Sequence, residues 1–266
     1  MTDDGFAALA AYIEQELDFA TSHYNDSYLE RRFSSRMRRT EANTYEEYRQ
    51  LLQKDSSEQS ELLNALSINV TGFFRNPEVW EGIRSILREL TENHFRVNIW
   101  SAACSDGREP YSIAMLAHDD PEINESRISV LATDINSEAL EKARNGTYEN
   151  TRTTDIDEQI EFLNNPFDHI TKIEDKFEVQ DQIKSDVRFE QHDLINDEPK
   201  SGFNLVLCRN LFIYIDSEYK IPVLRTVAQS LEQDGYLIIG KAETVPPELE
   251  SDFMAVDNRL RIYQRQ

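Results

Sequence analysis

The chain has 266 residues, with 28 Lys and Arg against 50 Asp and Glu, so its formal net charge at pH 7 is −22. This length allows one large domain or two smaller ones with hydrophobic cores. The negative surplus disfavours binding to nucleic-acid phosphates. Two cysteines are too few for a disulfide framework or a four-cysteine zinc site, and the five histidines have no metal-ligand spacing, so no metal is expected.

The longest apolar runs, 205–208 and 211–215, are far shorter than the roughly 20 residues that span a bilayer. The first four residues, Met-Thr-Asp-Asp, lack the basic region of a secretory signal. We therefore expect a cytoplasmic protein without membrane insertion.

The composition of the charges suggests salt adaptation. Of the 28 cationic residues 20 are Arg, and the residues in excess are Asp and Glu rather than apolar residues. At molar salt the Debye length falls to about 3 Å, which screens repulsion between surface carboxylates. The charge favours a halophilic source, with an ordinary acidic cytosolic protein as the alternative.

The first 70 or so residues are predicted to be helical. Apolar side chains recur at helical spacing in four stretches, which begin at Phe6, Leu29, Tyr45 and Leu62. From Val97 onward, short apolar strands alternate with helices, which is typical of a parallel sheet covered by helices. The expected strands are 97–102, 128–133, 187–191, 203–208 and 236–240, and the expected antiparallel hairpin is 253–256 with 260–263.

This pattern resembles the Rossmann-like α/β fold of SAM-dependent methyltransferases, with its seven-stranded sheet. About 40 residues separate the helix ending near Gly146 from the strand at Val187, where about 2 to 6 are usual. We therefore predict an inserted β subdomain at 146–186. The predicted domains are 1–72, all-helical, and 73–266, the methyltransferase domain.

The loop after the first strand has one glycine, Gly107, instead of the three that bring a backbone close to a pyrophosphate. It also carries Asp106 and Glu109, which would repel phosphates. The loop instead suits S-adenosylmethionine (SAM), which has adenosine, no phosphate and positive charge. Glu109 is then a candidate partner for that charge.

Polar residues follow the other strands at the same edge of the sheet. Asp134 is suited to accept hydrogen bonds from ribose hydroxyls. Asp193 can accept from the adenine amino group, while Leu194 packs on the ring. Arg209 and Asn210 lie where an active-site mouth is expected.

Four ordered segments carry a family resemblance. They are Asn-Val-Thr-Gly-Phe-Phe-Arg (69–75), Trp-Ser-Ala-Ala-Cys-Ser-Asp-Gly with Glu-Pro-Tyr-Ser (100–107 and 109–112), Ala-Thr-Asp-Ile (132–135), and Cys-Arg-Asn (208–210) with Tyr214. They resemble the signature segments of the chemotaxis receptor methyltransferases, the CheR family. The similarity covers nearly the whole chain, and with the acidic charge it suggests a member from a halophilic archaeon.

The resemblance implies SAM-dependent O-methylation of specific glutamates on the cytoplasmic helices of chemoreceptors, with S-adenosylhomocysteine (SAH) as the product. The residues implied to contact the cofactor are Asn69, Thr71, Arg75, Gly107, Glu109, Asp134, Asp193, Leu194, Arg209 and Asn210. Arg75 and Tyr214 are implied to lie beside the transferred methyl. Two positions depart from the family pattern: Arg108 replaces an acid, which puts the charge of the loop in doubt, and Asp193 replaces an asparagine.

Five arginines crowd into nine residues: Arg31, Arg32, Arg36, Arg38 and Arg39. The resemblance implies that their helix docks on the receptor, whereas an average protein would use such a cluster as a solvated face.

Several of these residues also have a purely structural interpretation. Asp134 could cap the next helix, Glu109 could favour a helix N-terminus, and Tyr214 could be core. Cys104 and Cys208 are expected to be buried and inert. For the whole chain, two different functions compete with receptor methylation: a non-catalytic adaptor that binds SAM or SAH, and a methyltransferase that acts on small molecules.

Overall fold

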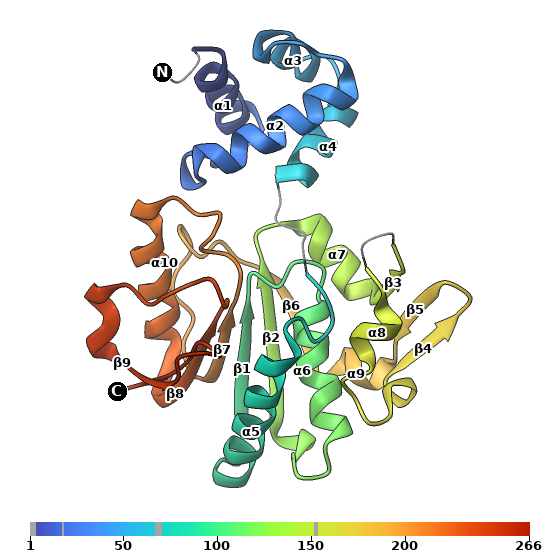
Figure 1. The fold of residues 1–266 in the computed structure, drawn as a ribbon, viewed down its shortest axis with the longest axis vertical. Coiled ribbons are helices and arrows are strands. Elements are labelled where there is room, and N and C mark those ends of the chain that lie inside the picture. Colours follow the sequence, from blue (N-terminus) through green and yellow to red (C-terminus); the bar gives the residue numbers. More distant parts are fainter. Residues whose placement is uncertain (1–3, 18, 67–70, 152–153) are drawn as a thin grey trace. The chain divides into compact units, whose positions relative to one another are not determined.

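The computed structural model describes residues 4–17, 19–66, 71–151 and 154–266 (Figure 1). The chain divides into two compact units. The helical unit comprises residues up to 68 together with 212–220, and the sheet unit comprises 69–211 together with 221–266. No helix in the described ranges is long and apolar enough to cross a bilayer.

The helical unit is built on the four predicted helices, which the structure confirms. They are α1 (Asp4–Glu16), α2 (Asp26–Thr40), α3 (Tyr45–Leu52) and α4 (Ser56–Leu66), with a 3-10 turn η1 (Thr21–His23). Leu9, Ile13 and Phe33 are fully buried in its core, because apolar residues recur on one face of each helix. The side chain of Asn25 caps α2 by accepting from the Tyr28 N–H.

A segment from late in the chain completes this unit. Tyr24 forms an isolated antiparallel bridge with Ile215. The Asn25 side-chain amide donates to the Tyr214 carbonyl at 2.9 Å, and the Asp216 N–H donates to the His23 carbonyl at 2.9 Å. The helical unit is therefore discontinuous in sequence.

A mostly parallel seven-stranded sheet forms the centre of the sheet unit, in the order β6-β2-β1-β7-β8-β10-β9 (Figure 1). Its strands are β1 (Val97–Ala102), β2 (Ile128–Asp134), β6 (Val187–Gln191), β7 (Phe203–Cys208), β8 (Leu231–Ile239), β9 (Phe253–Asp257) and β10 (Ile262–Arg265). The first five pair in parallel, and β10 pairs antiparallel with both β8 and β9. The Rossmann-like sheet and its closing hairpin are thus as predicted, although β8 begins five residues early.

Helices flank this sheet. They are α5 (Pro77–Asn93), α6 (Arg108–Asp119), α7 (Ser137–Asn145) and α10 (Ser217–Ser230), with the 3-10 turns η2 (Glu125–Arg127) and η4 (Pro247–Asp252). Helix α10 starts within the helical unit and continues into the sheet unit. Helix α5 was not predicted from the sequence, although Pro77 opens it and its side chains at Val79, Ile83 and Leu87 are fully buried at helical spacing.

The predicted insertion contains a small antiparallel sheet, as expected, in the order β3-β5-β4. We call residues 146–186 the insert. Its elements are β3 (Thr147–Glu149), α8 (Ile156–Ile160), η3 (Pro166–Asp168), β4 (Ile170–Ile173), β5 (Lys176–Val179) and α9 (Asp181–Ser185). Phe177, at the centre of β5, is fully buried, so the insert shares the hydrophobic core of the sheet unit.

Candidate active site

The loop between β1 and α6 (residues 103–107) begins at the carboxyl end of β1, which lies between β2 and β7 in the sheet. Ala103, Ser105 and Gly107 all have positive φ angles, of 56°, 54° and 88°. A left-handed conformation costs about 1 kcal/mol or more for a residue with a Cβ, and at Gly107 a Cβ would also lie 2.7 Å from the Cβ of Ala143. Any other residue at position 107 would strain the backbone and clash with Ala143, so glycine is required there.

Asp134 ends β2 beside this loop. Its Oδ2 accepts from the Ser105 N–H at 2.7 Å, and its Oδ1 accepts from the Asn136 N–H at 2.9 Å. Burial raises the pKa of this carboxyl above its usual range, although these backbone hydrogen bonds oppose the shift. Asn136, not Asp134, caps α7. Each carboxylate oxygen has a second lone pair, so Asp134 retains the capacity to accept hydroxyls.

Glu109 lies in the first turn of α6, where backbone dipoles favour an anion. Its Oε1 accepts from the Ser101 hydroxyl at 2.9 Å. Its Oε2 accepts from Nη1 of Arg209 at 3.1 Å, and the Arg209 side chain is only 2% exposed. The sequence predicted that Glu109 would face a cofactor's charge, but the structure gives it a buried cation of the protein as its partner.

Arg209 joins three parts of the chain. Besides Glu109, its Nη2 donates to the Arg75 carbonyl at 2.9 Å and to the Asn76 side chain at 3.2 Å. The Trp80 indole donates to the same Arg75 carbonyl at 3.1 Å. The guanidinium thus fixes the backbone at Arg75, a role that the sequence did not reveal because these residues lie over 100 positions apart.

The segment that precedes α5 has an irregular backbone. Phe74 and Asn76 have positive φ angles of 46° and 63°. The Phe74 N–H donates to the Ser112 hydroxyl of α6 at 3.1 Å. Thr71 and Arg75 are half-buried in this segment. Asn69, which the resemblance also implies as a cofactor contact, lies outside the described residues.

The turn after β6 carries Asp193 and Leu194. Asp193 accepts from the Ile195 N–H and from the Asn196 side-chain amide, both at 2.8 Å, so its carboxylate shapes its own turn. Leu194 is buried. The His192 N–H donates to the Asp134 carbonyl at 3.0 Å, which brings the ends of β6 and β2 together.

Asn210 follows β7 with a positive φ angle of 63°. Its N–H donates to Glu243 Oε2 at 3.1 Å, and the Gly240 N–H donates to the same oxygen at 2.5 Å. Glu243 is buried and links the ends of β7 and β8. Glu243 was not predicted as a site residue, although an acid just after the fifth predicted strand is a signal of the same kind as Asp134.

Tyr214 belongs to the helical unit. The centroid of its ring lies 5.0 Å from the centroid of the Tyr28 ring, and Tyr214 is half-buried.

Arg108 is one of the two positions that depart from the family pattern. It forms an ion pair with Asp106 at 2.7 Å, and its guanidinium lies over the Tyr148 ring, 5.7 Å from the centroid. Arg108 therefore offsets the charge of Asp106 in the loop.

The arginines of α2 differ in their surroundings. Arg36 is buried and forms an ion pair with Glu58 at 2.5 Å, whereas Arg31, Arg38 and Arg39 are exposed or half-exposed. Arg32 lies with its guanidinium 5.1 Å from the centroid of the Tyr28 ring.

Cys104 and Cys208 are both buried and free, as expected, and burial raises the pKa of each thiol, which disfavours the reactive thiolate. Among the described residues, no group of acids, cysteines and histidines could hold a metal ion.

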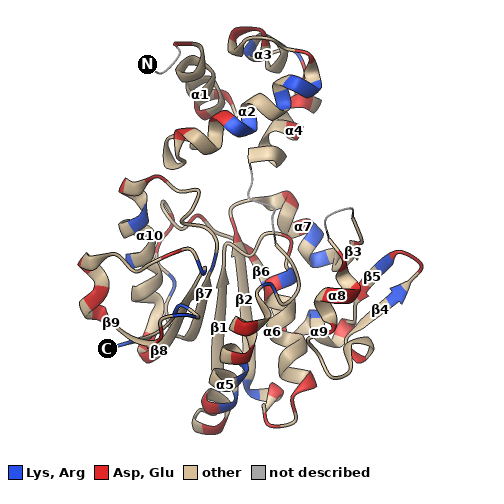
Figure 2. Ribbon diagram, viewed as in Figure 1, with Lys and Arg blue, Asp and Glu red and all other residues tan. Residues whose placement is uncertain are grey.

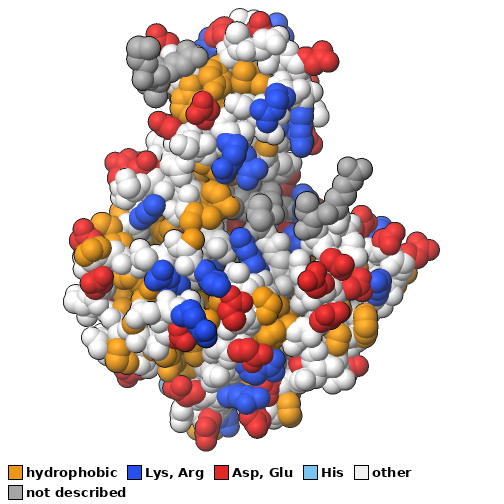
Figure 3. All heavy atoms as spheres, in the orientation of Figure 1, with side chains coloured by type: hydrophobic (Ala, Val, Ile, Leu, Met, Phe, Trp, Pro, Cys, Tyr) orange, Lys and Arg blue, Asp and Glu red, His pale blue; other side chains and the backbone are white. Residues whose placement is uncertain are grey.

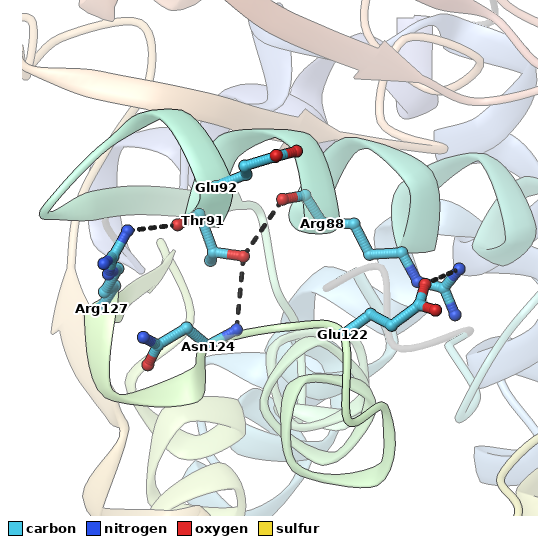
Figure 4. Close-up of a pocket in the computed structure, with 6 residues that line it drawn as sticks. All are labelled: Arg88, Thr91, Glu92, Glu122, Asn124 and Arg127. Carbon is cyan, nitrogen blue, oxygen red and sulfur yellow. Dashed lines mark hydrogen bonds and ion pairs between the residues drawn. The ribbon is translucent and has the colours of Figure 1, made fainter.

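A surface hollow lies between the end of α5 and the turn η2 (Figure 4). Arg88 is paired with Glu122 at 2.6 Å, and Arg127 donates to the Thr91 carbonyl at 2.6 Å. Because η2 directly precedes β2, this hollow lies by the amino end of that strand, away from Asp134. We assign it no part in the chemistry.

The donor set at the carboxyl ends of the strands fits an adenosine compound without phosphates. Asp134 and Asp193 at these strand ends would repel a pyrophosphate, and a loop with a single tight glycine stands in place of a glycine-rich phosphate loop. Sheet and site together define a SAM-dependent methyltransferase of the Rossmann-like class. Residues 69–262 match the model of the CheR methyltransferase SAM-binding domain, and residues 4–67 match that of the CheR all-alpha domain. The chain therefore belongs to the CheR methyltransferase family, and its cofactor is SAM.

Curated relatives share this assignment. The chain is 30% identical over 237 residues to the chemotaxis protein methyltransferase of Listeria monocytogenes, covering 88% of this chain and 87% of that protein. It is 31% identical over 259 residues to the protein of the same name from Borreliella burgdorferi, covering 92% and 89%. Among solved structures, a TehB-like SAM-dependent methyltransferase from Corynebacterium glutamicum matches with a TM-score of 0.38 and 13% identity, covering 72% of this chain and 94% of that one.

Proposed function

We propose that the protein transfers the methyl group of SAM to specific glutamate side chains on the cytoplasmic helices of chemoreceptors, forming methyl esters in chemotaxis adaptation. The observation that carries this proposal is the hydrogen-bonded tie from Glu109 through Arg209 to Arg75, in a chain of the CheR family. The tie connects the first turn of α6 to the segment that bears Arg75. The name of the relatives, chemotaxis protein methyltransferase, supports the pathway.

In this proposal Asp134 accepts the ribose hydroxyls, and Leu194 packs on adenine while Asp193 accepts its amino group. The remaining cofactor contacts are those that the family motifs imply, at Asn69, Thr71, Arg75, Gly107, Glu109, Arg209 and Asn210. Since Glu109 is paired with Arg209, their combined charge is close to zero. The acid can still accept further hydrogen bonds, because a carboxylate offers about four acceptor sites.

The chemistry requires positioning more than proton transfer. Bound SAM supplies an electrophilic methyl group on a positively charged sulfur. A glutamate is already ionised at pH 7, so its oxygen bonds to the methyl carbon while the carbon–sulfur bond breaks and its electron pair stays on sulfur. Arg75 orients the substrate carboxylate by a charge-assisted hydrogen bond, and Tyr214 donates its hydroxyl nearby. Holding the reacting atoms about 3 to 3.5 Å apart and excluding water supply the acceleration.

The receptor would dock on the arginines of α2 that are not buried, which are Arg31, Arg32, Arg38 and Arg39. Figure 3 shows basic side chains on the surface of the helical unit. Chemoreceptor helices that carry methylatable glutamates present negative charge, so the attraction is complementary. Arg36 is engaged with Glu58 and is not part of this surface.

The test is methyl transfer from labelled SAM to a receptor cytoplasmic fragment, followed by mapping of the esterified residues. We expect Arg75→Met and Tyr214→Phe to slow transfer, Arg75→Met by about 100-fold, because misplacement of the reacting groups costs about that much. Arg225→Met, at an exposed site on α10, is the control.

Each contrary outcome identifies a different error. Unchanged transfer in both variants would refute the assigned roles of Arg75 and Tyr214. Micromolar SAH binding without any transfer by the wild type would point to a non-catalytic adaptor. Transfer only to small acceptors would point to a small-molecule methyltransferase.

A further inference from the structure

The insert touches the segment that bears Arg75. Gln159, on α8, accepts from the Phe73 N–H through its Oε1 at 2.9 Å. A Cβ on Gly72 would lie only 3.1 Å from both Oε1 and Nε2 of the same amide. The absence of a side chain at Gly72 therefore lets the Gln159 amide lie directly against this backbone.

This contact is one of several that hold the segment in place. Phe74, the residue after Phe73, has a left-handed backbone, which a residue with a Cβ adopts only when its surroundings impose it. The Phe74 N–H is fixed by Ser112, and the Arg75 carbonyl by Arg209. Gln159 thus supplies the hydrogen bond that fixes the Phe73 N–H, and this bond comes from the insert.

The insert also touches the loop after β1. Tyr148, on β3, donates its hydroxyl to the Asp106 carbonyl at 2.7 Å. Its ring lies under the Arg108 guanidinium and meets the Phe73 ring edge-on at 5.1 Å between centroids. Tyr148 is buried, so these contacts are desolvated. One side chain of the insert therefore contacts both the loop and the Arg75 segment.

We propose that the insert is a positioning element for methyl transfer, in which Gln159 sets the backbone that carries Arg75 and Tyr148 sets the loop that faces the cofactor. This inference rests on the proposed function. Neither residue touches the reacting atoms; each acts through the backbone that it holds. Perturbing the insert at these contacts should therefore change turnover or cofactor affinity without changing the groups that do the chemistry.

The first test compares Gln159→Met with Gln159→Glu. Methionine has a similar shape but no strong acceptor for the Phe73 N–H, whereas glutamate keeps one. We expect Gln159→Met to lower kcat for methyl transfer about tenfold with little change in the KM for SAM, since loosening by less than about 1 Å costs less than the hundredfold of a full misplacement. Gln159→Glu should restore most of the rate.

Gln180→Met is the matched control, because Gln180 also lies in the insert but donates to the Phe167 carbonyl within it. All variants are compared by Tm, so that a general loss of stability is recognised. If Gln159→Met turns over like Gln180→Met, the role of Gln159 is refuted. If the wild type itself transfers no methyl group, it is the proposed function that fails, and the second test still applies.

The second test is the affinity of Tyr148→Phe for SAH, measured by calorimetry. Removing the hydroxyl frees the Asp106 carbonyl, and we expect SAH to bind about three- to tenfold more weakly, as for the loss of one hydrogen bond. The ring and its packing remain. An unchanged affinity would refute the role of Tyr148, whatever the methylation assay shows.

Discussion

Asp134 ionises less readily in the folded chain than an ordinary aspartate does. Burial is the largest influence on its pKa and raises it, and the backbone N–H groups of Ser105, Ile135 and Asn136 only partly compensate. Between the pKa of an unfolded aspartate and this raised value, the folded state binds more protons than the unfolded state. The contribution of Asp134 to the free energy of unfolding therefore falls as the pH rises through that range.

The same shift predicts a pH dependence of cofactor binding. A protonated Asp134 cannot accept on all its lone pairs. As the pH falls, SAH affinity should therefore weaken at a higher pH than it would for an aspartate with the ordinary pKa near 3.9. Calorimetry with SAH in a series of decreasing pH measures the effect. In Asp134→Asn, binding should be weak at every pH, and a wild-type affinity that stays constant until acid unfolding would contradict the assignment.

At the scale of elements, helix α2 combines structural and surface arginines. Arg36 makes two hydrogen bonds to Glu58 and one to Glu61, and Tyr48 donates to Glu58 at 2.6 Å. The hydrogen bonds to Glu58 raise the pKa of Arg36, which therefore stays charged. Arg38 and Arg39 lie in the last turn of α2, within one turn of Arg36, and both are exposed.

These surroundings predict that substituting the buried Arg36 lowers stability, whereas substituting the exposed Arg38 and Arg39 lowers receptor binding. Arg36→Met should lower the free energy of unfolding by about 3 to 5 kcal/mol, because it leaves the Glu58 carboxylate buried without its cation. The double variant Arg38→Glu and Arg39→Glu should change Tm little but weaken binding to a receptor fragment. Thermal unfolding and a binding titration at low salt separate the two effects, and equal losses of Tm would show that the cluster is structural throughout.

The sequence predicted the elements whose signals are local. Helical spacing indicated α1 to α4, and apolar runs bounded by turn residues indicated the parallel strands. Helix α5 was not predicted, although Pro77 marks its start and Val79, Ile83 and Leu87 recur at helical spacing, so its signal is as local as those of α1 to α4. Local patterns also identified Asp134 and Glu109 as strand-end acids. They could not predict that Glu109 pairs with Arg209, since that contact exists only after the sheet brings β1 and β7 side by side.

At the scale of the whole molecule, the dominant property is its charge. Acidic residues are spread over the helices and loops of both units (Figure 2), and the net charge is −22. With 50 acids and 28 bases, at least 22 carboxylates cannot be matched one-to-one with a cation of the chain. Self-repulsion therefore opposes folding at low ionic strength.

We expect Tm to rise continuously as KCl increases to about 2 M, because the Debye length keeps shrinking from about 8 Å at 0.15 M toward 3 Å near 1 M. An ordinary acidic protein should gain most of its salt stabilisation within roughly the first few hundred millimolar. Thermal unfolding in a KCl series distinguishes a salt-adapted protein from an ordinary acidic one. A Tm that reaches a plateau at low salt would refute the prediction of a halophilic source.

The bridge between Tyr24 and Ile215, with its hydrogen bonds at Asn25 and His23, means that two separate stretches of the chain form the helical unit. An excision that stops at residue 67, where the all-alpha family model ends, would discard the segment that Tyr24 pairs with and the ring that packs on Tyr28. Exchange of this unit between relatives, in the laboratory or in evolution, must therefore transplant two separated stretches at once. The first stretch carries the α2 arginines and the second carries Tyr214. A functional exchange of the unit would therefore transfer the arginines and the Tyr214 hydroxyl together.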